Sequence, residues 1–238
     1  MKVHVKTETG RRKNNEDSYY ISPDQELLIL ADGMGGHAAG EEASRMATDL
    51  IKNYLSKEDL KGPDKIKKAL KKAVLEANRT IYQRAQADPD LKGMGTTLSL
   101  VYFYEEDLYY LNIGDSRIYI LGHKDLFQLS KDDSFVNYLV EIGDITRQEA
   151  RVHPQKNILT KALGSFEDLE VEVDRFDGKK VRKLLLCTDG LSDVLEEEAI
   201  YKILVSDKTL EERTDMLVKK ALDLGSRDNI TVIVMDRE

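Results

Sequence analysis

Acidic residues end or interrupt apolar segments at five places along the 238-residue chain. A single acid in such a place is an ordinary turn or capping residue. Five together indicate a site at which several strand ends converge. The acids concerned are Glu16 with Asp17, Asp32, Asp115, Asp189 with Asp193, and Asp228.

Carboxylates gathered in this way need a counter-charge, because like charges packed together cost free energy. The segments offer carboxylate and glycine carbonyl oxygens, and the chain has one cysteine, Cys187. This ligand set favours Mg²⁺ or Mn²⁺ over zinc. Two such ions roughly 4 Å apart activate a water and stabilise in-line displacement at phosphorus. The sequence therefore predicts a two-metal hydrolytic site.

Residues 31–42, "ADGMGGHAAGEE", place four glycines directly after an apolar run. Glycine in an ordered segment indicates special backbone angles or a close approach to a ligand or to neighbouring backbone. We expect these glycines to let a backbone carbonyl join the metal shell.

The elements that must position these acids are predicted from hydrophobic periodicity. The expected helices lie at 40–54, 63–87, 195–205 and 209–224, with a short helical piece at 135–143. The expected strands lie at 2–7, 18–22, 26–32, 96–104, 107–113, 117–121, 125–130, 183–190 and 229–235. Short connections between 96 and 130 predict a meander, and hence a sheet that is at least partly antiparallel. Residues 131–157 lack clear periodicity, which is typical of a functional loop or small subdomain.

Composition limits the class of protein. Hydrophobic residues make up 41% and charged residues 34%, with a net charge of −8, which is typical of a soluble globular domain and argues against nucleic-acid binding. No apolar run approaches the roughly 20 residues that cross a bilayer. The N-terminus has no apolar core of a signal peptide, and a single cysteine excludes an intrachain disulfide. We expect a cytoplasmic protein. The lysines along 63–87 indicate a solvated helix face rather than a phosphate site.

Six motifs carry a family resemblance: "RKNNEDS", "ADGMGGHAAGE", "GMGTTL", "GDSRIY", "CTDGLSD" and "SRDNITV", in this order. Together they resemble the bacterial branch of the metal-dependent serine/threonine protein phosphatases, the type 2C or PPM family, over about residues 3–236. The resemblance implies an α+β fold, a four-layer α-β-β-α sandwich of two mostly antiparallel sheets flanked by helix pairs. It also implies a single domain over 1–238, with a flap subdomain at about 131–157.

The resemblance further implies the roles of individual residues. Asp32 would bridge two ions, with Glu16 and the Gly33 carbonyl completing one ligand set. Asp189 and Asp228 would serve the second ion.

Three more residues take roles by the same resemblance. Asp17 would orient metal-bound water without binding a metal itself. Asp115, with Asp189, matches a weaker third metal position, and Arg12 matches the arginine that binds the substrate phosphate, with Arg11 as the neighbouring alternative.

The implied function is hydrolysis of phosphoserine and phosphothreonine, by direct attack of a water or hydroxide held by two Mn²⁺ or Mg²⁺ ions. The implied partners are phosphoproteins and a cognate serine/threonine kinase, with neither nucleic acid nor a membrane, and the chain is expected to be a monomer. Two alternatives stay open. One is a phosphatase dedicated to a single regulatory protein, although such enzymes usually carry sensor domains. The other is an inactive binding module, which would lack metal ligands that are present here.

Other polar residues are expected to be structural. Thr96 and Thr97 are interpreted as strand residues, and Cys187 as a small buried residue. Asn229 either positions Asp228 or caps a turn. Many animal and plant family members carry a histidine where this chain has Met34; His37 follows three residues later and is interpreted as structural.

Overall fold

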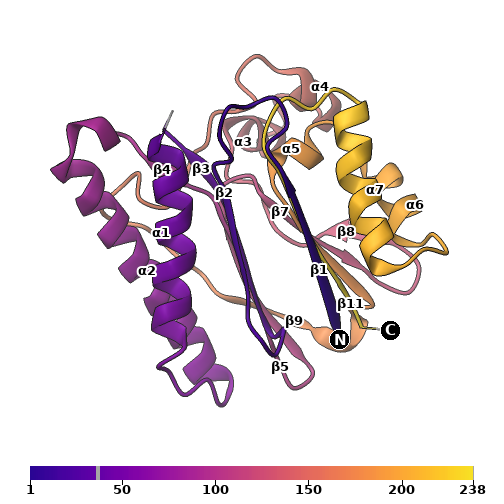
Figure 1. Ribbon diagram of the computed structural model, residues 1–238, viewed down its shortest axis with the longest axis horizontal. Coiled ribbons are helices and arrows are strands. Elements are labelled where there is room, and N and C mark those ends of the chain that lie inside the picture. The colour runs from indigo at the N-terminus through magenta and orange to yellow at the C-terminus, as the bar shows by residue number, and fades with distance from the viewer. Residues whose placement is uncertain (36–37, 238) are drawn as a thin grey trace.

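Two β-sheets packed face to face form the centre of the molecule, and helices cover the outer face of each (Figure 1). The computed structural model describes residues 1–35 and 38–237. Among the described residues, the strand pairs within both sheets are antiparallel. The first sheet has the order β1 (Lys2–Glu8), β11 (Ile230–Asp236), β10 (Lys183–Cys187), β7 (Arg117–Leu121), β8 (Leu126–Gln128). The second has the order β2 (Asp17–Ile21), β3 (Leu27–Met34), β5 (Leu98–Tyr104), β6 (Asp107–Ile113), β9 (Asp174–Asp177), and β4 (Gly95–Thr96) pairs with β3.

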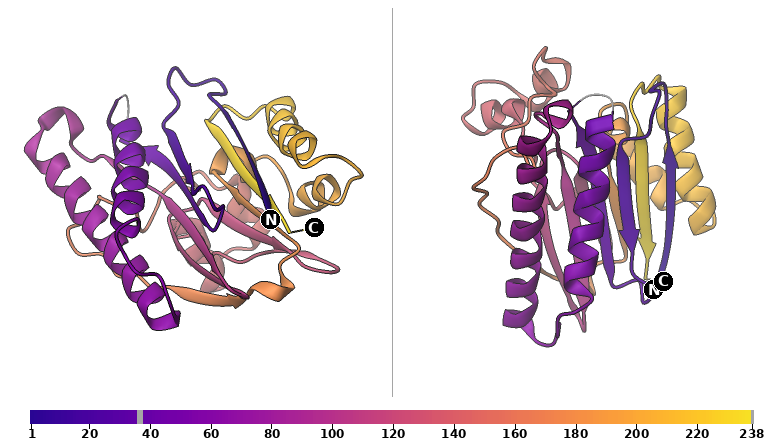
Figure 2. Two further views of the ribbon diagram at one scale, coloured as in Figure 1. Left: turned by 60° about the horizontal axis from the view of Figure 1, so that its bottom comes forward. Right: turned by 60° about the vertical axis from the view of Figure 1, so that its left-hand side comes forward.

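The helices divide between the two sheets. The long helices α1 (Ala38–Leu55) and α2 (Pro63–Ala87) lie on the second sheet, as both views of Figure 2 show. The first sheet is covered by α6 (Glu197–Leu204) and α7 (Leu210–Asp223), with the short α5 (Asp189–Ser192) directly after β10. This arrangement is the predicted α-β-β-α sandwich, and the expected fold class is confirmed.

The central strands are apolar without alternation because both of their faces are buried. In β3, Leu28 and Leu30 pack between the sheets, whereas Leu27, Ile29 and Ala31 pack under the helices. Full burial of a leucine or isoleucine side chain contributes about 1.5–3 kcal/mol to stability. A strand with two buried faces therefore stabilises the sandwich through both faces, and the acidic residues lie at the ends of such strands.

Helix α2 follows its predicted bounds. Pro63 stands in the first turn, where the missing backbone N–H costs nothing. Its buried stripe includes Ile66, Leu70, Val74 and Ile81. The lysines of this helix face outward and are exposed, as the sequence predicts.

Several predicted bounds were wrong. The expected strand at 183–190 ends at Cys187, and a helical turn begins at Asp189, because an acid at a helix N-terminus is favoured by the helix dipole. Helix α1 begins at Ala38 rather than Gly40, and β8 is shorter than 125–130. The four-residue β9 was missed because its sequence, "DRFD", has no apolar alternation.

The segment 131–157 contains two short helices, α3 (Phe135–Glu141) and α4 (Arg147–Val152), at the top of Figure 1. Only the first was predicted. Thr146 and Glu149 form a capping box at the start of α4, and this pair is a helix-start signal that the sequence already carries. Two 3₁₀ turns, Pro89–Leu91 and Gly178–Lys180, complete the described elements.

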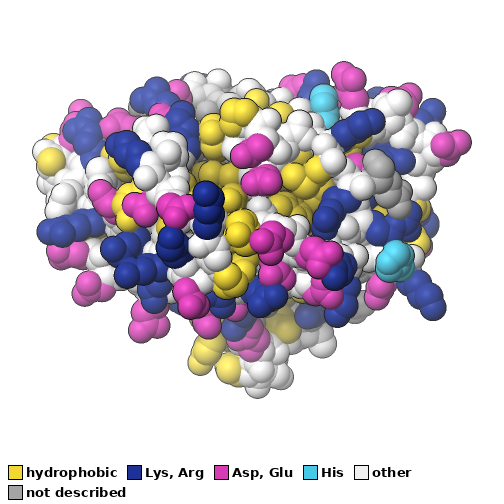
Figure 3. All heavy atoms as spheres, turned by 90° about the horizontal axis from the view of Figure 1, so that it is seen from below, with side chains coloured by type: hydrophobic (Ala, Val, Ile, Leu, Met, Phe, Trp, Pro, Cys, Tyr) yellow, Lys and Arg dark blue, Asp and Glu magenta, His cyan; other side chains and the backbone are white. Residues whose placement is uncertain are grey.

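The surface opposite the flap carries charges of both signs around a central strip of hydrophobic side chains (Figure 3). None of the helices in residues 1–35 and 38–237 combines the length and apolar character needed to cross a membrane.

Candidate active site

The acids of the second sheet meet where β2 and β3 pair. Asp17 lies directly opposite Asp32 in the antiparallel register. The Gly33 N–H donates to the Glu16 carbonyl at 3.0 Å. Glu16, Asp17, Asp32 and Gly33 therefore lie together at one end of this sheet.

The acids of the first sheet lie at the end of two neighbouring strands. Asp189 follows β10 and Asp228 precedes β11, and these strands pair antiparallel. The Thr188 N–H donates to the Thr231 carbonyl at 3.1 Å, so the pairing extends to the edge of the site.

The side chain of Asp17 connects the two sheets. Its Oδ2 accepts hydrogen bonds from Thr231 Oγ1 at 2.6 Å and from Thr188 Oγ1 at 3.2 Å. The predicted site residues of the two sheets thus converge at one end of the sandwich. The contribution of the two threonines was missed, because a hydroxyl in an apolar strand gives no distinctive sequence signal.

Two glycines near the site are required by close backbone packing. A Cβ on Gly33 would lie 2.0 Å from the Gly40 carbonyl oxygen and 2.7 Å from that of Glu16. A Cβ on Gly190 would lie 2.0 Å from the Asn229 carbonyl oxygen. The sequence left open whether these glycines serve special backbone angles or a close approach to a ligand or to neighbouring backbone. The structure shows the close approach of neighbouring backbone. Gly36 and His37 lie outside the described residues.

The carboxylates are electrostatically unfavourable as a group. Burial raises the pKa of Asp17 to about 7, against the opposing effect of its two hydroxyl donors. Burial, and then the neighbouring acids, hold the pKa values of Asp32 and Asp189 well above the ordinary aspartate range. A bound cation reverses this penalty, because it favours the ionised form.

Two buried oxygens test whether a metal ion fits this site. Within residues 1–35 and 38–237, Asp17 Oδ1 and Asp189 Oδ1 have no hydrogen-bond partner. A buried acceptor without a donor needs another counterpart. The ligand atoms that the predicted site residues offer to a metal ion are all oxygens, which suits Mg²⁺ or Mn²⁺. As the side chains of residues 1–35 and 38–237 are placed, no three acidic, histidine or cysteine groups surround a single point closely enough to hold a metal. The fit therefore rests on donor chemistry and on the two unpartnered oxygens.

Arg12 lies at the rim of the acid cluster. Its Nη2 is 2.7 Å from Asp228 Oδ2, and its side chain remains 57% exposed. Asp228 raises the pKa of the guanidinium further, first by hydrogen bonding and then by its charge. Arg12 is thus a cation that is both next to the acids and accessible to a substrate.

Asp115 reaches the acid cluster from a turn rather than from the end of β3 or β10. It follows Gly114 in the turn between β6 and β7. Burial, and then the charges of Asp132 and Asp193, raise its pKa to about 7. Asp115 and Asp189 line the same cavity of about 540 Å³ between the flap and the first sheet.

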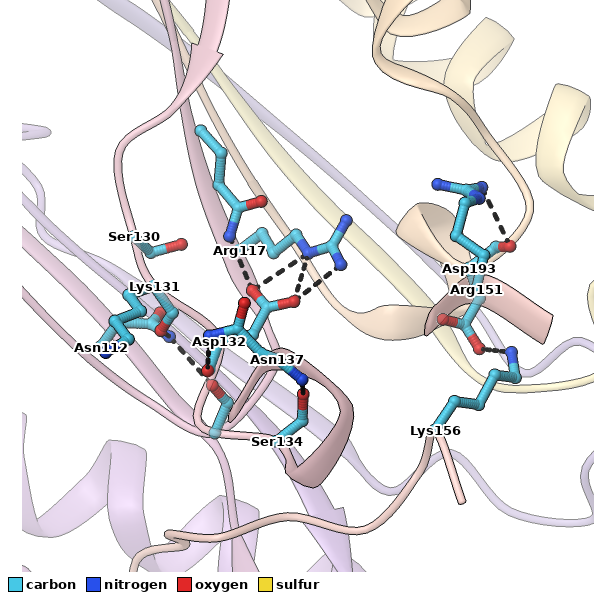
Figure 4. Close-up of polar contacts among 12 residues, drawn as sticks. Asn112, Arg117, Ser130, Lys131, Asp132, Ser134, Asn137, Arg151, Lys156 and Asp193 are labelled. Atoms are coloured by element: carbon cyan, nitrogen blue, oxygen red, sulfur yellow. Dashed lines mark hydrogen bonds and ion pairs between the residues drawn. The ribbon is translucent and has the colours of Figure 1, made fainter. Parts of the chain in front are cut away.

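Ion pairs attach the flap beside this cavity (Figure 4). Lys156 pairs with Asp193, and Arg151 Nη2 donates to the Asp193 carbonyl at 3.3 Å. At the base of the flap, Arg117 Nη2 pairs with Asp132 Oδ2 at 2.7 Å. These contacts were not predicted, since they join residues far apart in the sequence.

Comparison with known proteins gives the family. A family model described as protein phosphatase 2C matches residues 7–223. The chain belongs to the protein phosphatase 2C family. The serine/threonine phosphatase stp of Listeria monocytogenes is 38% identical over 243 residues, covering 100% of this chain and 96% of the relative.

Two solved structures of this family resemble the chain along nearly its whole length. Stp1 from Staphylococcus aureus has a TM-score of 0.94 at 37% identity, covering 99% of this chain and 94% of that one. The catalytic domain of the phosphatase PstP, in complex with two manganese ions, has a TM-score of 0.85 at 36% identity, covering 99% and 97%. The expected bacterial type 2C family is confirmed.

Proposed function

We propose that the chain is a metal-dependent protein-serine/threonine phosphatase, in which water attacks phosphorus directly. The observation that carries this proposal is the convergence of acids from both sheets, with unpartnered buried oxygens on Asp17 and Asp189, beside the exposed guanidinium of Arg12. Family membership supports the same conclusion.

The proposed metal ligands come from both sheets. Asp32 serves both ions, Glu16 and the Gly33 carbonyl serve one, and Asp189 and Asp228 serve the other. When bound, the two divalent ions supply Lewis acidity that lowers the pKa of water and offsets charge on the phosphoryl group. Manganese is supported by the PstP complex; magnesium is the alternative with the same ligand preference.

Asp115 is proposed to hold a weaker third ion together with Asp189. Burial, and then the charge of Asp115, raise the pKa of Asp189, and the two acids line one cavity. Because Asp115 lies in the β6–β7 turn, we expect its loss to leave the two principal positions in place.

Arg12 is proposed to bind the phosphate of the substrate. A guanidinium forms strong, often bidentate hydrogen bonds with phosphate oxygens. In this structure it contacts Asp228, so substrate binding would exchange or share that contact. Its exposure allows the phosphorylated side chain of a protein to reach it.

Asp17 is proposed to orient the attacking water. Thr231 and Thr188 occupy its Oδ2, which leaves Oδ1 as the acceptor for a water proton. Threonine donors fix the rotation of the carboxylate, and such outer partners commonly determine how well a metal site works.

A covalent enzyme intermediate is not needed in this account. Cys187 is fully buried, and burial raises the pKa of its thiol to about 12, so it is a poor nucleophile. The hydroxyl of Thr96 donates to the Asp32 carbonyl at 2.8 Å, and that of Thr97 accepts from the Asp32 N–H at 3.0 Å. These side chains support the backbone of β3, in line with their predicted structural role.

The substrates, the signalling partner, the cellular location and the oligomeric state are proposed from the activity. The substrates are phosphoproteins, and the signalling partner is a cognate serine/threonine kinase in the cytoplasm. We propose that residues 1–238 act as one monomeric domain, with the flap at 131–157 beside the substrate cavity.

The proposal is tested by phosphate release from a phosphothreonine peptide, with Mn²⁺, with Mg²⁺ and with EDTA. We expect hydrolysis with added metal and none after chelation, and a phosphotyrosine peptide provides a specificity control. Absence of hydrolysis with every divalent ion would favour the alternative of a binding module. Hydrolysis of one regulatory phosphoprotein but of no peptide would favour a dedicated phosphatase.

A further inference from the structure

A buried asparagine, Asn229, joins the β1–β2 loop to the strand end that carries Asp228. Its side-chain Nδ2 donates to the Thr9 carbonyl at 3.0 Å and to the Asn14 carbonyl at 2.9 Å. Its Oδ1 accepts from the Glu16 N–H at 2.8 Å. Asn229 is only 3% exposed. One amide group therefore holds the loop at three points.

The hydrogen-bond pattern requires an amide rather than a side chain of similar shape. An asparagine carries two N–H donors and one carbonyl acceptor on a single planar group, and all three directions are used here. An aspartate of the same size would place an acceptor oxygen against two carbonyl oxygens. A leucine would leave all three backbone groups without a partner, which is costly at a buried position.

The loop held by Asn229 lies in close contact with residues 227–229. Gly10 has a left-handed φ of 62°, and a Cβ there would lie 2.1 Å from the Asp228 carbonyl oxygen. The Arg11 N–H donates to the Arg227 carbonyl at 3.3 Å. The loop therefore follows one path across this strand end, and its outer part carries Arg12.

Asp228 itself does not depend on the Asn229 side chain. Its Oδ1 accepts from the Asn229 backbone N–H at 2.9 Å, and its Oδ2 contacts Arg12. A substitution at position 229 would keep the backbone contact. Its effect should therefore fall on the loop, at Arg12 and Glu16, rather than on Asp228.

We propose that Asn229 is a positioning residue that sets Arg12 and Glu16 against Asp228, and so couples phosphate binding to metal binding. This inference rests on the proposed function for its kinetic consequences. Asn229 touches neither substrate nor metal in this account; it acts through the loop. The sequence left Asn229 open between positioning Asp228 and capping a turn. The side chain instead holds the β1–β2 loop, and the contact with Asp228 comes from the Asn229 backbone N–H.

The chain offers a matched control, Asn78. This asparagine is also buried, and its Nδ2 donates to the carbonyls of Phe166 and Glu167 at 2.9 and 3.1 Å. Its Oδ1 accepts from the Gly164 N–H at 2.7 Å. Asn229→Asp and Asn78→Asp therefore remove the same donors from the same kind of site in two different loops.

The test combines amide hydrogen exchange with kinetics on p-nitrophenyl phosphate and calorimetric titration with Mn²⁺. In Asn229→Asp we expect amides of residues 9–17 to exchange at least about tenfold faster, with unchanged exchange in 164–167. We expect kcat/KM to fall roughly tenfold to a hundredfold through a higher KM and weaker Mn²⁺ binding, with kcat at saturation changed less. Asn78→Asp should show the reverse exchange pattern and near-normal KM.

Three results would overturn the inference: normal exchange over 9–17 in Asn229→Asp, a lower kcat with unchanged KM and Mn²⁺ affinity, or equal kinetic losses in both variants. If Asn229→Asp does not fold, Asn229→Ser carries the same test, because it keeps a small polar group with fewer donors. Failure of the proposed function would appear separately, as an inactive wild-type chain. The exchange measurement still tests the positioning role in that case.

Discussion

Asp115→Asn should stabilise the metal-free protein, because the wild-type carboxylate is buried near other acids. Burial, and then Asp132 and Asp193, raise the pKa of Asp115 from 3.8 to about 7. A difference of about 3 pKa units corresponds to at most ~4 kcal/mol at pH 8. The side chain keeps some exposed surface, which lets solvent screen the charge. We therefore expect a gain of about 1–2 kcal/mol, or roughly 2–8 °C in Tm for a domain of this size.

The pH dependence has a definite sign. The folded protein binds the Asp115 proton more tightly than the unfolded chain does, so the free energy of unfolding of the wild type falls as pH rises from about 4 to about 7. Asp115→Asn has no carboxyl group at this position, so its free energy of unfolding does not fall over this pH range for this reason. The difference between the two proteins should therefore be largest above pH 7 and should vanish below pH 4.

The assay is thermal unfolding in EDTA at pH 4 and pH 8, followed by the same scans with Mn²⁺. Asp144→Asn, an exposed position on the flap, controls for the change in net charge. Added Mn²⁺ should reduce the advantage of Asp115→Asn, because the ion then favours the carboxylate. Equal Tm values of wild type and Asp115→Asn at pH 8 in EDTA, or a less stable variant, would refute the reasoning from burial and charge.

Three further predictions concern the chemistry. Arg12→Ala should raise KM for p-nitrophenyl phosphate more than it lowers kcat, while Mn²⁺ affinity measured by calorimetry stays within a few-fold; a collapse of metal affinity at unchanged KM would assign Arg12 another role. Asp189→Asn should remove most activity with the fold intact, as judged by circular dichroism, and near-normal turnover at saturating Mn²⁺ would contradict its assignment as a ligand. Thr231→Val removes a donor to Asp17 and so should raise the pKa of that carboxyl further, which moves the acid limb of the pH–rate profile up by roughly one unit. An unmoved acid limb would show that Asp17 ionisation does not control the rate.

The fold was predictable where both periodicity and burial were strong. Helix α2 has the bounds that its apolar stripe predicts, and the meander strands β5 to β7 lie close to the expected ranges. Boundaries failed where an acid suited to a helix start mattered more than the apolar pattern, as at Asp189, which begins a helical turn instead of ending a strand. The polar strand β9 is formed by its pairing with β6, and no local signal predicts it.

The site was predictable as a set of acids at strand ends, because aspartate after a buried strand is a local pattern. The partners that hold these acids could not be predicted. For Asn229, the sequence left two roles open, positioning Asp228 or capping a turn. Thr231 reaches Asp17 from 214 positions away, and Asn229 holds Glu16 from 213 positions away. Such contacts depend on which strand ends the two sheets bring together, and a single sequence does not contain that information.

The central claim is that acids from the two sheets jointly bind the divalent ions that hydrolysis requires. It is tested most directly by calorimetric titration of the metal-stripped protein with Mn²⁺, in the wild type and in Asp32→Asn, with phosphate release from a phosphothreonine peptide measured on the same samples. We predict two tight equivalents of Mn²⁺ in the wild type, with activity rising as they fill, and loss of both tight binding and activity in Asp32→Asn. Two tight equivalents retained in Asp32→Asn, or full activity in wild-type protein that holds no metal, would contradict the claim.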